Sequence, residues 1–387
     1  MSGVSIVGVG TTPVDKHWES SMRELGVRAI NDALRDAGVS REAVDSLYVG
    51  NMLSGKVVDQ ENVGALIADF ADLGHVPATK VEAACASGGA ALQAGVKGVL
   101  SGLEDLTVVL GVEKLTDVCK CDVNEGLAYA ADQEFETFHG ATFVSLNAMA
   151  TRLYMQEFDV DHEDLMHFSV NAHRNAANNP DAMFQSEIDV ETAMNSVEIA
   201  DPLKLFDVTP ICDGAAAVVL APSDRADEYC ETPVEVSGVG NAVDSIGLHD
   251  REEFVEMAAT LEAADQAYDM ASMTPGDVDV IELHDAFTVM SAMGLEDMGF
   301  VEKGEAAKAA REGRITVDGD LPATTMGGLK ARGHPVGATG VYQAVEIVEQ
   351  LRGEAGANQV PDAETGIAQN IGGTGSNVTV TILERGD

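Results

Sequence analysis

The feature that most constrains this chain is an alternation of strand and helix patterns that occurs twice. In the first third, apolar strand patterns alternate with amphipathic helical patterns; the strands cover 4–9, 44–49, 79–84 and 106–110, and the helices 20–37, 62–70 and 87–100. The pattern returns later, with strands at 234–239 and 278–283 and helices at 253–270, 287–298 and 340–351. This alternation predicts largely parallel α/β layers, and its return suggests internal duplication.

A segment of different composition separates the two parts. Residues 116 to about 207 are richer in Met, His, Asn and Phe and lack clear strand alternation, whereas residues 215–220 again have the pattern of a buried strand. We therefore expect an N-terminal half at 1–116 and 208–232, a partly helical loop domain inserted at 117–207, and a C-terminal half at 233–387. At the end of the chain, strand patterns at 366–371 and 377–383 around a Gly-Gly-Thr-Gly turn predict a hairpin.

The charge balance excludes several classes of partner. The 387 residues contain 23 Lys and Arg against 65 Asp and Glu, which gives a net charge of −42. Such a surface repels nucleic acids and anionic membranes, so we expect neither as a partner. Because the acidic residues are spread along the chain, they favour a halophilic cytoplasmic protein, in which salt screens the repulsion, over an ordinary acidic one.

Targeting signals and cysteine usage also indicate a cytoplasmic protein. No stretch approaches the roughly 20 apolar residues of a membrane-spanning helix, and the N-terminus has the pattern of a first strand rather than a signal peptide. The five cysteines form an odd set in a long chain, so reduced thiols are expected. Cys119 and Cys121 are expected to be free, since two thiols without a second pair make a weak zinc site.

Cys85 is the first candidate for chemistry. It lies between a predicted strand and a predicted helix, in Glu-Ala-Ala-Cys-Ala-Ser-Gly-Gly. The unpaired N–H groups and the dipole at a helix N-terminus favour a thiolate and lower the pKa of a thiol. Gly88 and Gly89 allow another backbone to approach closely. On this segment alone, a buried structural cysteine is an equally good interpretation.

Three further segments could supply partners for a nucleophile. His284 ends an apolar strand in Ile-Glu-Leu-His-Asp-Ala-Phe, His334 lies within the glycine-rich stretch Gly327–Gly340, and Asn-Ile-Gly-Gly-Thr-Gly begins at Asn370. Taken singly, they could be a core histidine, a connecting loop and a hairpin turn. Together with a cysteine they indicate attack of a thiolate on a thioester. A histidine would take up the thiol proton, and histidine and backbone N–H groups would stabilise the oxyanion or enolate.

In this order and spacing, the four segments resemble the thiolase family. The likeness is closest to archaeal and sterol-carrier-protein-type thiolases, which carry His-Asp-x-Phe, and Gly-His-Pro-Val-Gly-Ala-Thr-Gly is its most specific motif. It covers essentially the whole chain. The resemblance implies an α/β thiolase fold, a duplicated five-layer αβαβα arrangement with an inserted loop domain over the active site. It also implies a homodimer or tetramer.

The resemblance also implies roles for individual residues. Cys85 would be the acylated nucleophile and His334 its activating base. His284 and His334 would form one oxyanion hole, and the backbone N–H groups of Cys85 and Gly372 the other. Coenzyme A thioesters would be substrates, with no permanently bound cofactor and no metal. Weaker motif positions suggest substrate contacts, near the coenzyme A channel or in the acyl pocket, for His249, Arg251 and His139.

The chain departs from the family at the second catalytic cysteine, which removes the α-proton. Its two known positions hold Asn370 and Ala286, and a carboxamide is no general base at ordinary pH. His284 or a water could act instead, the chain could condense only slowly, or a partner could be needed. Archaeal thiolases of this pattern associate with a small zinc-ribbon/OB-fold protein and sometimes with hydroxymethylglutaryl-CoA synthase, which implies a similar partnership here.

The implied activity is that of an acetyl-CoA C-acyltransferase. Two acyl-CoA molecules would condense to a 3-ketoacyl-CoA such as acetoacetyl-CoA, or thiolysis would run in reverse. Condensation would serve isoprenoid or polyhydroxyalkanoate synthesis, and thiolysis would serve fatty-acid breakdown. Two alternatives are a ketoacyl-synthase-type relative and a non-catalytic scaffold that binds coenzyme A or lipid. The retained Cys85, His284 and His334 argue against a scaffold, which needs none of their chemistry.

Overall fold

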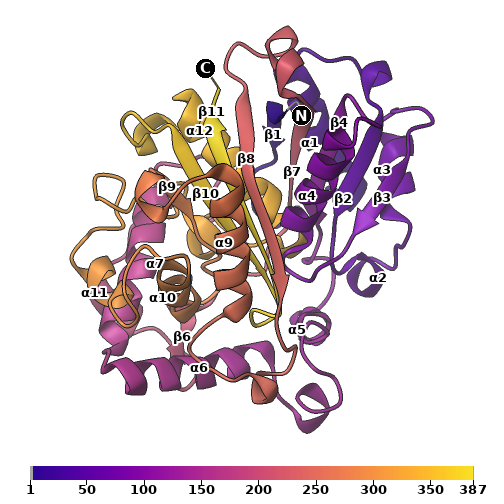
Figure 1. The fold of residues 1–387 in the computed structure, drawn as a ribbon. Helices are drawn as coiled ribbons and strands as arrows, with labels where there is room; N and C mark the ends of the chain where they lie inside the picture. The colour runs from indigo at the N-terminus through magenta and orange to yellow at the C-terminus, as the bar shows by residue number, and fades with distance from the viewer. Residues whose placement is uncertain (1–2, 387) are drawn as a thin grey trace.

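The computed structural model describes residues 3–386, in which nine strands lie side by side in the order β3-β2-β4-β7-β1-β8-β11-β10-β9 (Figure 1). Their bounds are β1 Val4–Thr11, β2 Ser46–Gly50, β3 Ala78–Val81, β4 Thr107–Glu113, β7 Gly214–Pro222, β8 Val234–Val243, β9 Val280–Glu282, β10 Thr365–Gly372 and β11 Asn377–Arg385. Two short strands, β5 (Glu198–Ala200) and β6 (Leu203–Lys204), form a separate pair.

The strand order supports internal duplication. From β1 outward the pairings are antiparallel to β7, antiparallel to β4 and parallel to β2, and from β8 outward they are antiparallel to β11, antiparallel to β10 and parallel to β9. The two sets meet where Ser5 and Ile6 pair with Glu235 and Val234. The expectation of largely parallel layers is wrong. The long segment after β4 leads into β7, which pairs antiparallel to β4, and a hairpin leads from β10 into the antiparallel β11. Neither connection is the crossover that a parallel pair needs.

Helices occupy three layers that the two strand sets separate. The principal helices are α1 (Met22–Asp36), α3 (Val63–Phe70), α4 (Ser87–Leu100), α9 (Ala258–Ala271), α10 (Thr288–Asp297) and α12 (Thr339–Arg352). Helices α1 and α3 share one buried cluster, α9 and α10 share another, and α4 and α12 contact each other in the cluster between them. This is the five-layer αβαβα order that the resemblance to thiolases implies.

Residues 117–207, which we expect to form an inserted loop domain, come between β4 and β7, and part of this segment lies at one end of the molecule (Figure 1). They contain α5 (Lys120–Ala128), α6 (Phe143–Phe158), α7 (His162–Ala176) and α8 (Val190–Met194). Helix α5 contacts the short α2 (Ser54–Val57), while α7 packs on α10 and on α11 (Ala306–Arg311). Within residues 3–386, no helix combines the length and apolar character that crossing a membrane requires.

Candidate active site

The turn before α4 fixes Cys85 in place. The preceding residue, Ala84, has a φ of +52°, which is rare for a residue with a side chain and marks local strain. Ser87 braces this turn, since its hydroxyl accepts from the N–H of Ala83 at 2.9 Å and donates to the carbonyl of Ala84 at 2.6 Å. The Cys85 side chain is thereby held just ahead of the helix, as the sequence predicts.

Glycines bring the N-terminal ends of α4 and α12 together. A Cβ atom on Gly340 would lie 2.2 Å from the N atom of Gly89, and one on Gly89 would lie 2.1 Å from Thr379 Oγ1. Because the atom opposite Gly340 belongs to the backbone, that position requires glycine, while a side chain at Gly89 would force the Thr379 hydroxyl to shift. This contact confirms the expected close approach at Gly89. It brings the segment that follows β3 and the segment that precedes α12 to the same place.

His334 follows a wide turn that starts at Gly327. The N–H of Arg332 reaches back to the carbonyl of Gly327, and Gly327 and Gly333 take positive φ angles of 108° and 116°. The imidazole is buried, and its Nδ1 lies 2.7 Å from Thr339 Oγ1. A general base needs the tautomer in which Nδ1–H donates to that hydroxyl, because Nε2 is then free to accept a proton.

Asn370 determines the tautomer of His284. Its Oδ1 accepts from the N–H of Gly89 at 3.1 Å, and its Nδ2 donates to the carbonyl of Cys85 at 3.1 Å, so two backbone groups fix the amide's orientation. The same Nδ2 lies 3.2 Å from His284 Nδ1. Nδ1 must therefore accept, and the proton of neutral His284 lies on Nε2. His284 is a hydrogen-bond donor with the properties that an oxyanion hole needs.

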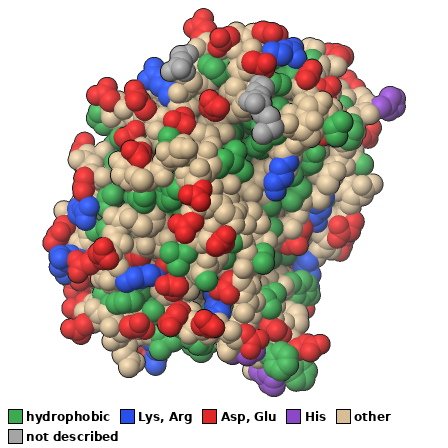
Figure 2. Space-filling view, viewed as in Figure 1, with side chains coloured by type: hydrophobic (Ala, Val, Ile, Leu, Met, Phe, Trp, Pro, Cys, Tyr) green, Lys and Arg blue, Asp and Glu red, His purple; other side chains and the backbone are tan. Residues whose placement is uncertain are grey.

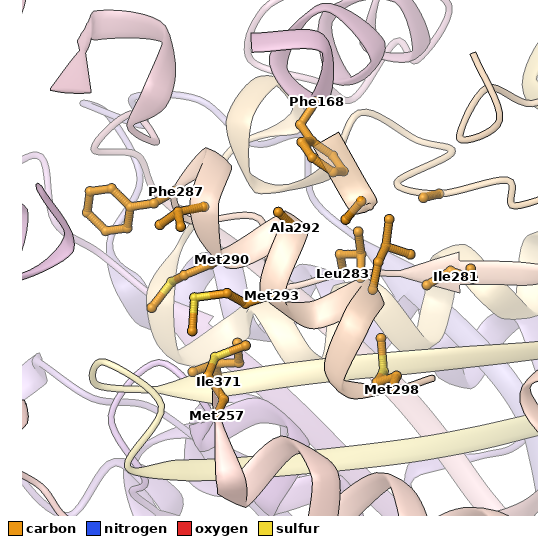
Figure 3. Packing of buried hydrophobic residues seen from close by; sticks show 14 of the residues in the cluster. Phe168, Met257, Ile281, Leu283, Phe287, Met290, Ala292, Met293, Met298 and Ile371 are labelled. Carbon is orange, nitrogen blue, oxygen red and sulfur yellow. The ribbon is translucent and has the colours of Figure 1, made fainter. Parts of the chain in front are cut away.

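Packing holds the His284 segment firmly. Leu283 and Phe287, on either side of His284, belong to the buried cluster that includes Met290 and Met293 of α10 (Figure 3). The backbone from β9 into α10 is thus anchored in the core, whereas His284 itself lines the cavity described below. The buried neighbours hold the backbone of His284 rigidly while its side chain faces the cavity, and a catalytic group needs this kind of fixed position.

Both histidines are neutral near pH 7. Burial lowers the pKa of His284 to about 3, and the nearby Arg332 guanidinium contributes. Burial also holds the pKa of His334 well below its usual value, with His284 and Arg332 adding to the effect. The rings meet edge to face with centroids 5.1 Å apart. Arg332 remains charged because Glu346 pairs with it at 2.8 Å.

The expected low pKa of Cys85 is wrong. Burial, and secondly the carboxylate of Glu113, raise the pKa of this thiol to about 12, and the backbone N–H groups of Cys85 and Gly373 offset only part of that. Desolvation therefore raises the pKa of Cys85 by more than the helix N-terminus lowers it. The resting group is a thiol that needs a base. The role predicted for the Gly372 N–H stays a prediction, since the neighbouring Gly373 supplies the contact with the thiol.

Cys85, His284 and His334 line one cavity of about 820 Å³. The opposite wall comes largely from residues 124–211, among them Phe143, Phe184 and Phe206. Most of the lining is apolar, which is typical of a pocket that receives a small-molecule substrate and keeps water out. Ala286 and Phe287 complete the wall beside His284.

The weaker candidates do not reach this cavity. The side chain of His139 is exposed and contacts Phe138, which corrects its expected place in the acyl pocket. His249 is 43% exposed beside Glu136. Arg251 is buried and donates to the carbonyls of Thr374 and Ser245, so its guanidinium supports the turn after β10. Its expected place near the coenzyme A channel stays a prediction.

The expectation of free thiols is wrong at two positions. Cys119 and Cys121 form a disulfide with Cα atoms 5.3 Å apart, within the usual range for such a bond, while Cys85, Cys212 and Cys230 are free. Within residues 3–386, Cys119 and Cys121 with Asp122 are also the one group spaced as metal ligands. Sulfurs bonded to each other are not available as thiolates, so this group carries no metal site in this state.

Sequence reasoning missed three buried charged residues around the site. Glu113 accepts the N–H groups of Met52, Leu53 and Gly337, and burial raises its pKa to about 7. Lys330 lines the cavity, and Arg332 lies two residues before His334 in the chain. Lys330 and Arg332 both lie within the glycine-rich segment Gly327–Gly340. Basic side chains in a connecting loop are ordinarily exposed to solvent, so two of them in a segment predicted to pack tightly were the available signal of a buried charge.

Comparisons with known proteins agree with this geometry. Residues 4–224 match the family model "Thiolase, N-terminal domain", and residues 240–385 match "Thiolase C-terminal domain-like". The chain is 49% identical to an acetyl-CoA acetyltransferase of Methanothermobacter thermautotrophicus over all of both chains. It is 41% identical to one of Methanocaldococcus jannaschii over 99% of each.

A solved structure supports the fold independently. The structure named "Ltp2-ChsH2(DUF35) aldolase" superposes with a TM-score of 0.88 at 25% identity and covers 99% of this chain and 97% of that one. Two family models span nearly the whole chain, and the full-length relatives are enzymes that transfer acyl groups. The chain therefore belongs to the thiolase family and is an acyltransferase.

Proposed function

We propose that the chain is an acetyl-CoA C-acetyltransferase that works through an acetyl thioester on Cys85. The observation that carries the proposal is the meeting of a protonated thiol and two neutral histidines in the lining of one cavity. One histidine can accept a proton and the other can donate a hydrogen bond. Acyl transfer followed by enolate chemistry needs both properties.

In the first half-reaction, His334 Nε2 takes the Cys85 proton as sulfur attacks the acetyl-CoA carbonyl. The tetrahedral oxyanion forms beside the backbone N–H of Cys85 and, as we propose, that of Gly372. The carbon–sulfur bond to coenzyme A then breaks, and the imidazolium returns its proton to the departing thiolate. The products are acetyl-Cys85, free coenzyme A and a neutral His334.

In the second half-reaction, a second acetyl-CoA loses its α-proton. His284 is a donor through Nε2, so it suits the enolate oxygen and not the proton. We assign the α-proton to His334 Nε2, which is free again once coenzyme A has left. The enolate carbon attacks the carbonyl of acetyl-Cys85, the carbon–sulfur bond to Cys85 breaks as acetoacetyl-CoA forms, and the His334 imidazolium returns its proton to the Cys85 thiolate. Thiolysis is the reverse of these steps.

The proposal is tested by assaying the purified chain for thiolysis of acetoacetyl-CoA with coenzyme A, and for condensation of acetyl-CoA, in molar salt. We expect both reactions, since the same residues serve both directions. Binding of coenzyme A thioesters without either reaction would instead support the scaffold interpretation.

Asn370 is expected to act as a positioning residue. Asn370→Ala removes the amide that holds His284 Nδ1 as an acceptor, so the Nε2–H donor is no longer fixed. Condensation should fall about 10-fold or more, while acetyl exchange between coenzyme A molecules, which uses the other oxyanion hole, should fall less. Steady-state rates of both reactions on the same preparation measure this split. Equal losses would assign Asn370 a purely structural role.

The surface charge predicts a dependence on salt. Acidic side chains are scattered across the face in Figure 2 and outnumber basic ones, as the net charge of −42 requires. Activity and melting temperature should fall as salt drops from about 1 M, where the Debye length is about 3 Å, to about 0.1 M, where it is about 10 Å. Full activity at low ionic strength would contradict the halophilic interpretation.

We further propose that the chain works in the cytoplasm as a homodimer or tetramer. We also propose a zinc-ribbon/OB-fold partner, and hydroxymethylglutaryl-CoA synthase as the consumer of acetoacetyl-CoA in isoprenoid synthesis. The partner is supported by the solved structure named "Ltp2-ChsH2(DUF35) aldolase", since that name gives two proteins together. Size-exclusion chromatography of native extract should show the chain in a hetero-complex, whereas elution only as a homo-oligomer would count against the partner.

A further inference from the structure

The carboxylate of Asp285 reaches the glycine-rich turn that precedes His334. Its Oδ1 accepts from the N–H of Leu329 at 2.6 Å, and its Oδ2 accepts from the N–H of Lys330 at 3.3 Å. A Cβ atom on Gly328 would lie 2.6 Å from the same Oδ2. The turn therefore wraps around the carboxylate, and its successive N–H groups form the kind of concave site that binds an anion.

The Lys330 side chain places a positive charge near this carboxylate. Lys330 and Asp285 are 3% and 2% exposed. Burial lowers the pKa of Lys330 to about 8, and the carboxylates of Asp285 and Asp207 oppose that change. Burial raises the pKa of Asp285, and the Lys330 ammonium is the first of the groups that oppose it. The ammonium also donates to the carbonyl of Asp207 at 2.7 Å. The two buried charges thus stabilise each other.

These contacts join the segments that carry the two histidines. Asp285 follows His284 directly, and the turn that it holds leads into His334, about 50 residues further along the chain. Gly327 and Gly328 both take positive φ angles in this turn, of 108° and 54°. Because glycine has little preference for one backbone conformation, the shape of such a turn depends on the contacts that hold it. Asp285 supplies two of them.

We propose that Asp285 is a positioning residue, whose carboxylate holds the turn before His334 and so fixes that imidazole relative to His284. The inference rests on the proposed function, in which the two histidines act on one reaction. Asp285 does not line the cavity, so it acts through the backbone of the turn and not on the substrate. Displacing a reacting group by about 1 Å can slow a reaction about 100-fold, so the contact matters for rate.

Asp285→Asn is the first test. The carboxamide keeps the size of the side chain but replaces one acceptor oxygen with an amino group, which cannot accept an N–H. At saturating acetyl-CoA, the rate of Cys85 acetylation should fall about 10-fold or more, as measured by rapid quench and intact mass spectrometry. The fraction of chains that finally becomes acetylated should stay native. A lower fraction with an unchanged rate would overturn the proposal, because it would mean only that folded protein is lost.

A double variant separates position from charge balance. Asp285→Asn alone leaves a buried lysine without its nearest carboxylate and so destabilises the fold. Asp285→Asn with Lys330→Met removes both charges, so the melting temperature should recover while acetylation stays slow. Lys330→Met alone keeps the carboxylate in the turn and should be acetylated faster than the double variant. Equal rates in these two chains, or a double variant whose rate recovers with its melting temperature, would overturn the proposal.

The matched control is Asp297→Asn with Lys303→Met. Asp297 is buried and pairs with Lys303, and neither residue lines the cavity. This chain also loses a buried aspartate and its lysine partner, yet it should keep the native rate of acetylation. A loss as large as that of the Asp285→Asn, Lys330→Met chain would contradict a specific role for Asp285.

Hydrogen exchange separates this inference from the proposed function. Without any acyl-CoA, the Asp285→Asn, Lys330→Met chain should exchange the backbone N–H groups of residues 329 and 330 faster than the native chain, by about 10-fold or more. The Asp297→Asn, Lys303→Met chain should not. If acetyl-CoA failed to acetylate the native chain, the proposed function would fail, while exchange would still show whether Asp285 holds the turn. Unchanged exchange at these two positions would overturn the inference.

Discussion

Replacing Cys85 with Ala is expected to remove acyl transfer by a factor of at least about 10⁴, since no other side chain can carry the thioester intermediate. Both thiolysis of acetoacetyl-CoA and exchange of labelled coenzyme A into acetyl-CoA pass through the covalent thioester on Cys85, so both should disappear together. Among the cysteines of residues 3–386, Cys85 alone lines the cavity, so no other thiol there can take over. Radiometric exchange on the purified variant measures the loss.

The matched control is Cys230→Ala. Cys230 is free and half-buried, and it contacts Arg352 far from the cavity wall. This variant should keep native exchange and thiolysis. Exchange that persists in the Cys85→Ala chain would contradict the nucleophile assignment, however slow the overall reaction became.

The second large effect is expected for His334→Ala. With the pKa of Cys85 raised to about 12, the thiolate fraction near pH 7 is only about 10⁻⁵, so attack depends on a base. Loss of His334 should slow coenzyme A exchange by about 100-fold or more. The rate of exchange at saturating acetyl-CoA is the measurement. An unchanged rate would place the base elsewhere.

His284→Ala provides the matched comparison. As a donor to the enolate oxygen, His284 should matter little for exchange, whereas condensation should fall about 100-fold, as when an oxyanion donor is removed. The ratio of the two rates therefore separates the histidines. Equal losses in exchange and condensation would contradict the division of roles that their tautomers indicate.

Local patterns predicted the framework of the site. The helix expected at 87–100 is observed as α4 (Ser87–Leu100), and the hairpin expected at the end of the chain forms from β10 and β11. These features depend on short-range signals, such as apolar periodicity, glycine positions and turn residues. Glycines also predicted a close backbone approach at Gly89, and in the structure this approach brings Cys85 and His334 to one cavity.

Long-range burial determined what the patterns could not show. The pKa of Cys85 depends on its complete burial and on Glu113, which lies 28 positions away along the chain on β4. Arg251 lies in a segment that resembles a family motif, yet its guanidinium donates a hydrogen bond to the carbonyl of Thr374 in the turn after β10. The importance of Asn370 was visible only as a missing cysteine, because its bonds to Gly89, Cys85 and His284 join distant segments.

The most direct test of the central claim is the location of the acetyl group after the purified chain meets acetyl-CoA in molar salt. The protein is quenched in acid, digested, and its cysteine-containing peptides are identified by mass spectrometry. The account predicts one acetyl group, on Cys85, that coenzyme A removes. An acetyl group on Cys212 or Cys230, or an unmodified chain, would contradict it.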